Sequence, residues 1–447
     1  MQHIAIIGNC ISGVTCARYI RKQNSDVKIS IISGETSHFF SRTALMYIYM
    51  GHMRFKDTQP YEPHFWKKNR IDLRKGYVEK VDAQKKQLLF KGGDFLSFDK
   101  LIIASGSKSN KFGWPGQDLK NVSGLYSLQD LEAMEAGSKD LSRAVIVGGG
   151  LIGLEMAEMF MSRNIPVTML VREANYWDIV LPKEESQMVS DHIIEHGIDL
   201  RLGTELKEIV DDGTGKVCAV ITNKGERIDC GYVGLTAGVS PNIDFLNGSG
   251  INTQKGIVVN EFLETNLQDI YAIGDCAQLA DPRPGRRPIE AVWYTGRIMG
   301  ETVAHTICGQ KTLYDPGVWF NSAKFLDIEY QVYGNVDTET KDNHQAIFWQ
   351  HPLGKKSIRL VYEKNKDSVI GFNLMGIRYR HEVCEKWIKE KTPLEEVLTN
   401  LSLANFDPEF FDEYEPELIN IYRQQTGKNL ELKQKRNTNA VLQFLGF

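Results

Sequence analysis

The stretch VIVGGGLIGLEMAE, residues 145–158, decides how this chain is expected to fold. An apolar run typical of a buried strand leads into Gly148, and Gly150 and Gly153 complete the spacing G-x-G-x-x-G at the start of a helical pattern. In such a turn the first glycine permits the tight bend, the second lets a pyrophosphate approach the backbone, and the third lets helix and strand pack closely. We therefore predict a dinucleotide-binding turn; the alternative is a glycine-rich turn without a ligand.

A second stretch, IAIIGNCISG at residues 4–13, has nearly the same pattern. Gly8 and Gly13 occupy the first and third glycine positions, but Cys10 stands in the middle. It is either a small packing residue or a thiol with a chemical role, and its place near a helix N-terminus favours the thiolate. A disulfide with Cys16 is not expected, because six helical residues span about 9 Å along the axis.

Each turn lies inside a strand-helix-strand pattern, which predicts a parallel sheet. From about residue 310 short alternating strands and then a helical pattern follow. We predict an α/β protein with two doubly wound, Rossmann-like dinucleotide-binding domains and a C-terminal α+β domain. The expected boundaries are 1–110 with 240–308 for the first domain, 111–239 for the second, 309–400 for the third, and 401–447 for a charged C-terminal extension.

Composition narrows the class of protein. The chain has 447 residues and a formal net charge of −4, so it lacks the basic field of a nucleic-acid-binding protein. No apolar stretch approaches the roughly 20 residues of a membrane span, and we expect no signal peptide. The seven cysteines are scattered without a C-x-x-C pair, which is typical of a reducing, cytoplasmic compartment.

The segment ETNLQDIYAIGDCA, residues 264–277, places an acid after one more buried strand. We expect Asp275 to lie at the start of a helix. Its carboxylate could accept hydrogen bonds from polyol hydroxyls, or could simply cap that helix.

Four segments in this order, GNCISG, IIASG, GGGLIGLEMAE and IYAIGDCA, resemble the FAD-dependent pyridine nucleotide-disulfide oxidoreductases over about residues 1–400. The resemblance is closest to rubredoxin and ferredoxin reductases, the flavin part of nitrite reductase and the apoptosis-inducing-factor type. It implies FAD at the first and last segments and NADH or NADPH at the third. The residues implied for FAD are Gly8, Ser12, Gly13, Glu35, Arg42, Ala104, Ser105, Gly106, Gly274, Asp275 and Trp293, and those for NAD(P)H are Gly148, Gly150, Leu151, Ile152, Gly153, Arg172 and Gly238.

The chain departs from that family in two places that bear on catalysis. Disulfide reductases of the family carry a redox cysteine near residues 40–47, and here the segment reads FSRTALMY without one. Related ferredoxin reductases carry a lysine that pairs with the glutamate matched by Glu155, and the aligned residue here is Tyr47. By this resemblance Glu155 and Tyr47 are the candidate catalytic residues. Glu155 is either less constrained than in those reductases, hydrogen-bonded to Tyr47, or an interdomain structural carboxylate.

The choice of nicotinamide cofactor depends on the end of the strand in TMLVREAN, residues 168–175. NADH enzymes usually place an acid there for the ribose 2′-hydroxyl, but this chain has Val171 followed by Arg172. A guanidinium suits a 2′-phosphate, which favours NADPH slightly. Glu173, one position later, remains available for NADH, and Arg172 could also be an ordinary surface residue.

The predicted activity is that of an FAD-dependent NAD(P)H oxidoreductase, which passes hydride to flavin and electrons to a rubredoxin- or ferredoxin-like carrier or to a small oxidant. Arg283, Arg286 and Arg287 could steer a small acidic carrier protein, or form a solvated loop. Trp319 could neighbour the flavin, or pack between domains.

The alternative function is an apoptosis-inducing-factor-like switch with little turnover. For that switch the acidic residues 405–418 and basic residues 428–436 would bind a partner, unless they form a solvated helix and tail. A homodimer through the C-terminal domain is a further prediction.

Overall fold

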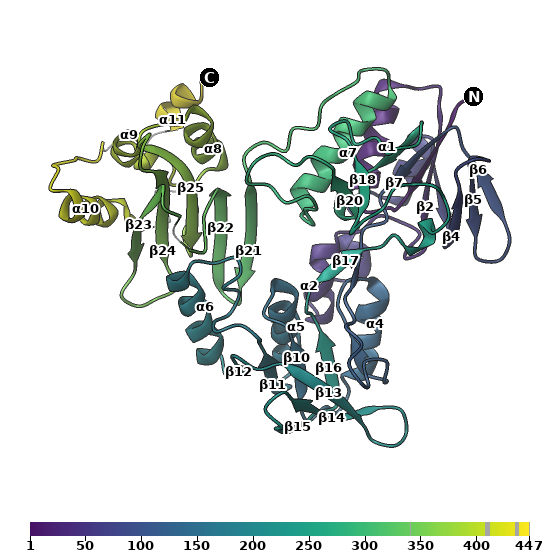
Figure 1. Cartoon of the computed structure of the whole chain (residues 1–447), viewed down its shortest axis with the longest axis horizontal. Coiled ribbons are helices and arrows are strands. Elements are labelled where there is room, and N and C mark those ends of the chain that lie inside the picture. The colour runs from purple at the N-terminus through teal and green to yellow at the C-terminus, as the bar shows by residue number, and fades with distance from the viewer. Residues whose placement is uncertain (340, 407–411, 434–437, 447) are drawn as a thin grey trace. The chain divides into compact units, whose positions relative to one another are not determined.

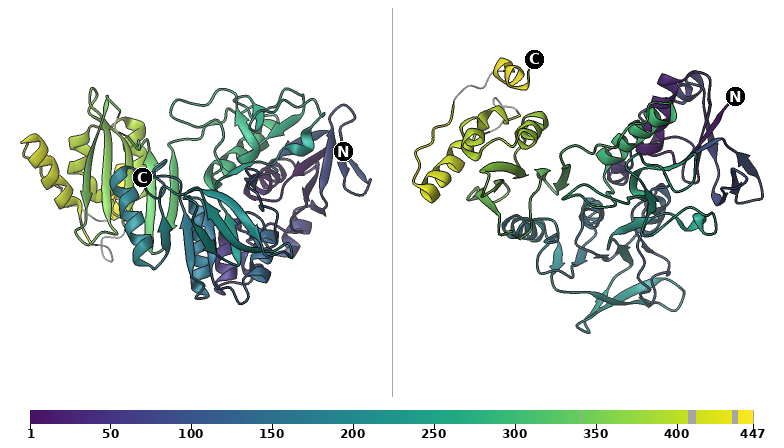
Figure 2. Two further views of the ribbon diagram at one scale, coloured as in Figure 1. Left: turned by 60° about the horizontal axis from the view of Figure 1, so that its bottom comes forward. Right: turned by 45° about the horizontal axis from the view of Figure 1, so that its top comes forward.

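The computed structural model describes residues 1–339, 341–406, 412–433 and 438–446 (Figures 1 and 2). The chain divides into two compact units. The first comprises residues 1–148, 155–169 and 205–316, and the second comprises residues 149–154, 170–204 and 317–447. The predicted fold class is confirmed: parallel sheets with helices come first, and an antiparallel sheet with helices follows them.

The first parallel sheet carries the first glycine-rich turn. Its five strands lie in the order β19 (Ile270–Ala272), β7 (Lys100–Ile103), β1 (His3–Ile7), β2 (Lys28–Ser33) and β3 (Ile71–Lys75). All four neighbouring pairs are parallel. Helices α1 (Ile11–Gln23) and α7 (Trp293–Ile307) pack side by side. Because β1 is almost fully buried at the centre, the turn that follows it is held by the core.

The second parallel sheet has the order β12 (Asp199–Arg201), β11 (Val167–Leu170), β10 (Ala144–Val147), β16 (Tyr232–Leu235) and β9 (Val122–Ser123). The second glycine-rich turn joins β10 to α5 (Leu151–Ser162). Helix α4 (Leu128–Gly137) belongs to the first compact unit and helix α6 (Lys183–Glu195) to the second. The predicted strand-helix-strand pattern is thus present twice.

Smaller elements complete the first unit. The short sheets are formed by β4 (Val78–Asp82), β5 (Gln87–Phe90) and β6 (Phe95–Ser97); by β13 (Leu206–Asp211), β14 (Val217–Thr222) and β15 (Arg227–Asp229); by β8 (Ser107–Ser109) and β17 (Val239–Pro241); and by β18 (Ile257–Val259) and β20 (Ala277–Leu279). The remaining helices are α2 (Leu45–Tyr49) and α3 (Pro63–Lys68), with 3-10 turns η1 (Arg42–Ala44), η2 (Phe55–Thr58), η3 (Asp244–Leu246) and η4 (Gly274–Cys276).

The C-terminal sheet is antiparallel, with the order β21 (Phe320–Phe325), β22 (Ile328–Gly334), β25 (Ser368–Met375), β24 (Ser357–Glu363) and β23 (His344–Gln350). The helical elements of this region are α8 (His381–Glu390), α9 (Leu394–Thr399), η5 (Leu401–Leu403), α10 (Glu415–Thr426) and α11 (Thr438–Leu445). Helix α8 packs on β25, α10 on β23 and α11 on α8 (Figure 1).

Part of the predicted charged extension belongs to the core of this domain. Leu418, Ile419 and Tyr422 of α10 are buried in the same apolar cluster as Trp387. The charged residues of α10 therefore cover an apolar face, as in an ordinary amphipathic helix. Residues 407–411 of the acidic segment and 434–436 of the basic segment lie outside the described residues.

Candidate functional site

The first glycine-rich turn is fixed by close backbone contacts. Gly8 has a φ of +111°, and a Cβ on this residue would lie 2.0 Å from the carbonyl oxygen of Ala104. A Cβ on Gly13 would lie 2.2 Å from the carbonyl oxygen of Gly8. Cys10 is the N-cap residue of α1, and its side chain makes no capping hydrogen bond. The turn therefore leaves the first N–H groups of α1 available to an anion.

Cys10 lies against a cluster of charged groups. Arg42 Nη2 donates to Cys10 Sγ over 2.9 Å and lies 2.5 Å from Glu35 Oε2. Glu35 Oε1 accepts from the backbone N–H of Leu128 over 2.9 Å. Burial raises the pKa of the Cys10 thiol, against the lowering effect of Arg42. The expectation that the helix N-terminus favours the thiolate is wrong, because burial outweighs the positive charge.

Asp275 lies where the predicted acid was expected, but on a different element. It belongs to the three-residue turn η4, which leads into strand β20, and helix α7 begins only at Trp293. The predicted helix start at Asp275 is wrong, since the backbone continues into a strand and then a loop with three prolines at residues 282, 284 and 288. The carboxylate is consequently not a helix cap.

Asp275 accepts hydrogen bonds from Tyr126 Oη over 3.2 Å and from Ser107 Oγ over 3.3 Å. Burial raises its pKa, and the two hydrogen bonds act in the opposite direction. Gly274 lies against Ser12, because a Cβ on Gly274 would be 2.5 Å from Ser12 Oγ. The structure thus brings the first and last FAD segments together.

Tyr126 was missed by sequence reasoning. Its hydroxyl bonds to Asp275, the guanidinium carbon of Arg42 lies 4.6 Å from its ring centroid, and its backbone carbonyl accepts from Arg42. The sequence signal was weak, since GLYSLQD, residues 124–130, carries no glycine spacing of its own. Two other expected residues are less engaged: Ser105 donates to the backbone carbonyl of Asn242 over 2.7 Å, and Trp293 is 40% exposed.

The second glycine-rich turn contains one position that the protein leaves open. Gly148 has a φ of +125°, and a Cβ there would lie 2.6 Å from the carbonyl oxygen of Thr236. A Cβ on Gly150 would meet no described atom within 4 Å. The hydroxyl of the buried Tyr176 donates to the Gly150 carbonyl over 2.8 Å. The protein itself therefore does not require glycine at position 150, whereas a bound pyrophosphate would.

The other residues expected near the nicotinamide cofactor are placed on the same elements. Leu151 and Ile152 are half-buried at the start of α5, and Gly153 is buried. Gly238, with a φ of +93°, lies in the segment after β16.

Comparison with known proteins assigns the family. Residues 2–305 match the family described as Pyridine nucleotide-disulphide oxidoreductase. The chain belongs to this family. FAD and NAD(P)H are the cofactors that this membership supports. The two turns and Asp275 fit them by their open glycine, free helix N–H groups and half-buried acceptor.

Individual relatives differ in length. The assimilatory nitrate reductase electron transfer subunit of Bacillus subtilis (strain 168) is 27% identical over 62% of this chain, and the match spans only 36% of that relative. NADH-rubredoxin oxidoreductase of Clostridium acetobutylicum is 25% identical over 89% of this chain and 99% of its own length. The solved structure of a NAD-dependent persulfide reductase from A. fulgidus has a TM-score of 0.84, with 22% identity, over 95% of this chain and 84% of that chain, which shows a common fold.

Arg172 of this family member is already paired with its neighbour. Its Nη2 lies 2.8 Å from Glu173 Oε1, and its side chain is 70% exposed. A 2′-phosphate would have to compete with Glu173 for the guanidinium. The two residues that sequence analysis weighed against each other thus contact one another.

Glu155, one of the two candidate catalytic residues, has a raised pKa. Burial raises its pKa to about 7, and the charge of Glu158 adds to the increase. Among the described residues no hydrogen bond joins Glu155 to Tyr47, whose ring stacks on His52 with centroids 6.1 Å apart. Of the alternatives for Glu155, the hydrogen bond to Tyr47 is not formed between these described residues, which leaves a less constrained or a structural carboxylate.

The loop proposed for carrier docking carries less free charge than its sequence indicated. Arg286 forms a buried ion pair with Glu290 over 2.5 Å, and Arg283 lies 2.7 Å from Asp315.

All seven cysteines are free, which confirms the absence of a Cys10–Cys16 disulfide.

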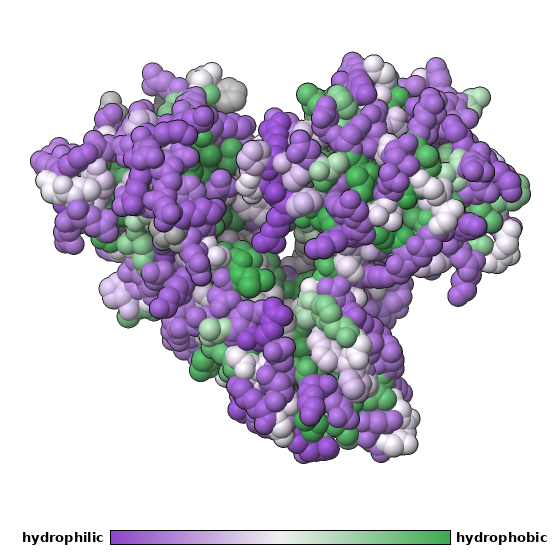
Figure 3. All heavy atoms as spheres, viewed as in Figure 1, coloured by the Kyte–Doolittle hydropathy of each residue, from purple (hydrophilic) through white to green (hydrophobic). Residues whose placement is uncertain are grey.

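Within the described ranges, no helix combines the length and apolarity that crossing a membrane requires. The face drawn in Figure 3 is mostly hydrophilic, with apolar residues interspersed.

Proposed function

We propose that this chain is an FAD-dependent NAD(P)H oxidoreductase that passes electrons to a small carrier protein or a small oxidant. The observation that carries the proposal is the pair of turns, one lined by Arg42 and Asp275 and the other open at Gly150, in a chain without cysteine at residues 40–47. Bound FAD and NAD(P)H would supply the hydride chemistry, and the protein would supply binding and orientation.

The residues of the first turn would hold FAD. The N–H groups at the start of α1 and the guanidinium of Arg42 are both positive and lie close to Cys10, so they would bind the pyrophosphate. Glu35 orients Arg42 and offers a carboxylate to the adenosine ribose. Asp275 would accept from the ribityl hydroxyls, with Tyr126 and Ser107 holding its carboxylate in place.

The second turn would hold NAD(P)H, with Gly150 giving the pyrophosphate access to the backbone. Burial raises the pKa of the Glu155 carboxyl to about 7, and by the family resemblance we propose Glu155 as a catalytic group that can hold a proton. The role of Tyr47 stays a prediction.

We further propose a modest preference for NADPH, based on Arg172. Arg172→Ala should then lower kcat/KM for NADPH about tenfold and leave that for NADH nearly unchanged, because one charged hydrogen bond is lost. A wild-type protein that prefers NADH by a wide margin would instead make Glu173 the ribose ligand.

The electron acceptor is proposed by analogy with the rubredoxin-reducing relative. The Arg283–Arg287 loop gives this proposal little support, since Arg283 and Arg286 are already paired. The switch alternative relied on the C-terminal extension, but α10 buries Leu418 and Ile419 in its own domain. A homodimer through that domain stays a prediction.

Anaerobic mixing tests the proposed function. Purified protein reconstituted with FAD should lose its oxidised-flavin absorbance on addition of NADH or NADPH, and should regain it rapidly when rubredoxin, ferredoxin or a quinone is added. Prior alkylation of accessible cysteines should not change this result. A long-lived charge-transfer species that no acceptor discharges would favour the switch, and failure to bind FAD at all would contradict the proposal.

Asp275→Ala is the matched test of the flavin site. We expect FAD to dissociate at least tenfold more readily, because an acceptor for the ribityl hydroxyls is lost. An unchanged dissociation constant would remove Asp275 from the site.

A further inference from the structure

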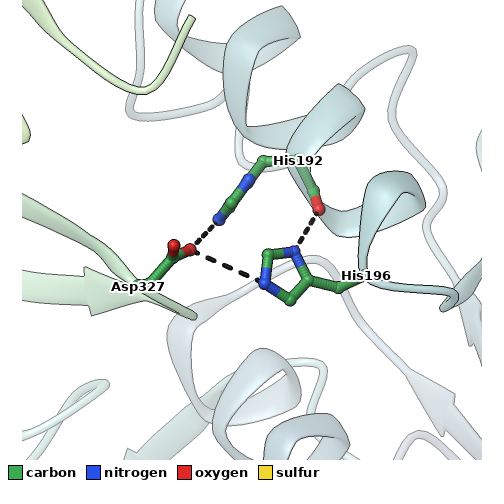
Figure 4. A group of neighbouring side chains, drawn as sticks. All are labelled: His192, His196 and Asp327. Atoms are coloured by element: carbon green, nitrogen blue, oxygen red, sulfur yellow. Dashed lines mark hydrogen bonds and ion pairs between the residues drawn. The ribbon is translucent and has the colours of Figure 1, made fainter.

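Three side chains of the second unit converge at the C-terminal end of α6 (Figure 4). His192 and His196 are four residues apart, so they lie on the same face of the helix end. Asp327 lies in the two-residue turn between β21 and β22. One ligand atom from each residue lies within 4.8 Å of the other two. None of the three takes part in the cofactor sites described above.

The contacts of His196 fix its proton. Its Nδ1 lies 2.9 Å from the carbonyl oxygen of His192, and a carbonyl can only accept, so Nδ1 carries the hydrogen. In the neutral ring Nε2 then presents a lone pair, and it lies 3.6 Å from Asp327 Oδ1. A lone pair facing a carboxylate oxygen is a repulsive arrangement that a cation between the two atoms would make attractive.

The two ring nitrogens of His192 differ in their contacts. Its Nε2 hydrogen-bonds to the same Asp327 oxygen, while its Nδ1 is buried and has no hydrogen-bond partner among the described residues. Glu195 Oε2 lies 3.6 Å from Nδ1. A cation on Nε2 would place the imidazole hydrogen on Nδ1, directed toward Glu195. Metal-binding histidines commonly direct the second N–H to a carboxylate or carbonyl in this way.

We propose that His192, His196 and Asp327 bind a divalent first-row transition ion, with Zn²⁺ as the ion to test. Two imidazoles and one carboxylate form a donor set that suits Zn²⁺ and leaves the fourth position to water. Bond lengths of about 2.0–2.1 Å place tetrahedral ligands about 3.3 Å apart, close to the observed 3.6 Å between His196 and Asp327. The ion would tie the end of α6 to the β21–β22 turn.

Binding requires a small rearrangement that the structure permits. Asp327 must move away from His192 Nε2 to admit the ion, and its side chain is 60% exposed, whereas His192 is only 2% exposed. Lys355 Nζ lies 3.7 Å from Asp327 Oδ2 and would oppose a cation. Lys355→Met should therefore tighten binding.

Isothermal titration of metal-stripped, alkylated, FAD-reconstituted protein with Zn²⁺ tests the site, with Co²⁺ absorption reporting its geometry. We expect one ion per chain and a tetrahedral Co²⁺ spectrum. His196→Gln and Asp327→Asn, which change partly exposed side chains, should each weaken binding at least tenfold. Zn²⁺ should raise the thermal midpoint of the wild type but not of these variants.

His344→Gln is the matched control, because His344 pairs with Asp337 without a second histidine in the described surroundings. It should bind Zn²⁺ like the wild type. Equal affinity in wild type, His196→Gln and Asp327→Asn, or no stoichiometric binding by the wild type, would overturn the proposal and leave a hydrogen-bonded cluster only. Circular dichroism of each variant checks that the fold is retained.

Discussion

The two glycine-rich turns have the same spacing but are constrained by different partners. Gly8 and Gly148 both have a positive φ, and a Cβ on either would strike a backbone carbonyl of the adjoining segment. The middle positions differ: Cys10 contacts Arg42, while Gly150 faces open space. The first glycine is therefore required by the protein's own backbone, whereas the middle residue concerns the ligand. Substitutions at these positions should separate stability from binding.

Gly8→Ala should have the largest effect. Its Cβ would lie 2.0 Å from a carbonyl oxygen, so we expect a loss of about 3 kcal/mol in the free energy of unfolding, together with loss of bound FAD. Urea denaturation and FAD content measure both. Gly92→Ala is the control, because Gly92 has the same backbone strain, at a φ of +112°, but nothing within 4 Å of its Cβ. Equal destabilisation by the two substitutions would show that the contact with Ala104 is unimportant.

Gly150→Ala should leave the free energy of unfolding within about 0.5 kcal/mol of wild type, because the added methyl group meets no described atom. The same substitution should lower kcat/KM for NAD(P)H about tenfold or more, since the methyl group occupies the approach of the pyrophosphate. Steady-state kinetics and thermal melting give the two numbers. A Gly150→Ala variant that loses stability but keeps its affinity for the cofactor would show that the protein, and not the ligand, requires glycine at position 150.

The helices after the two turns also differ. The position two residues after the third glycine is Thr15 in α1 and Glu155 in α5. Burial raises the pKa of Glu155 from 4.5 to about 7. Between these two pH values the folded state holds a proton on Glu155 that the unfolded state has released. Stability from this group is complete below about pH 4.5 and is lost as the pH rises through about 7.

Glu155→Gln should therefore remove a decline in stability of about 2 kcal/mol between pH 5 and pH 8. Urea denaturation of wild type and variant at both pH values measures it. A decline of the same size in both proteins would assign the pH dependence to other groups.

Cys10→Gly should have the smallest effect. Arg42 keeps Glu35 and the Tyr126 carbonyl when Sγ is removed, so the FAD dissociation constant should change by no more than about threefold and turnover should persist. Flavin titration and NAD(P)H oxidation provide the readout. If the variant kept its FAD but no longer transferred electrons, the Cys10 thiol would have a chemical role and would not be a packing residue.

Sequence patterns predicted these regions unequally. The spacing of Gly148, Gly150 and Gly153, and of Gly8 and Gly13, predicted both turns because local backbone geometry imposes it. The helix expected at Asp275 is absent, since the chain pairs β20 with β18, a contact that only the tertiary structure creates. Tyr126 and the Arg172–Glu173 pair were not predicted, because side-chain contacts leave no periodic signal.

The burial of α10 has a practical consequence for anyone who handles this protein. The apolar cluster that contains Trp387 and Leu398 also contains Leu418, Ile419 and Tyr422. These three residues come from the segment that the sequence presents as a charged extension. Truncating the chain after residue 400 would expose apolar surface on the remaining domain, and the truncated protein would aggregate during purification. A tag or fluorescent fusion should therefore leave residues 415–426 in place.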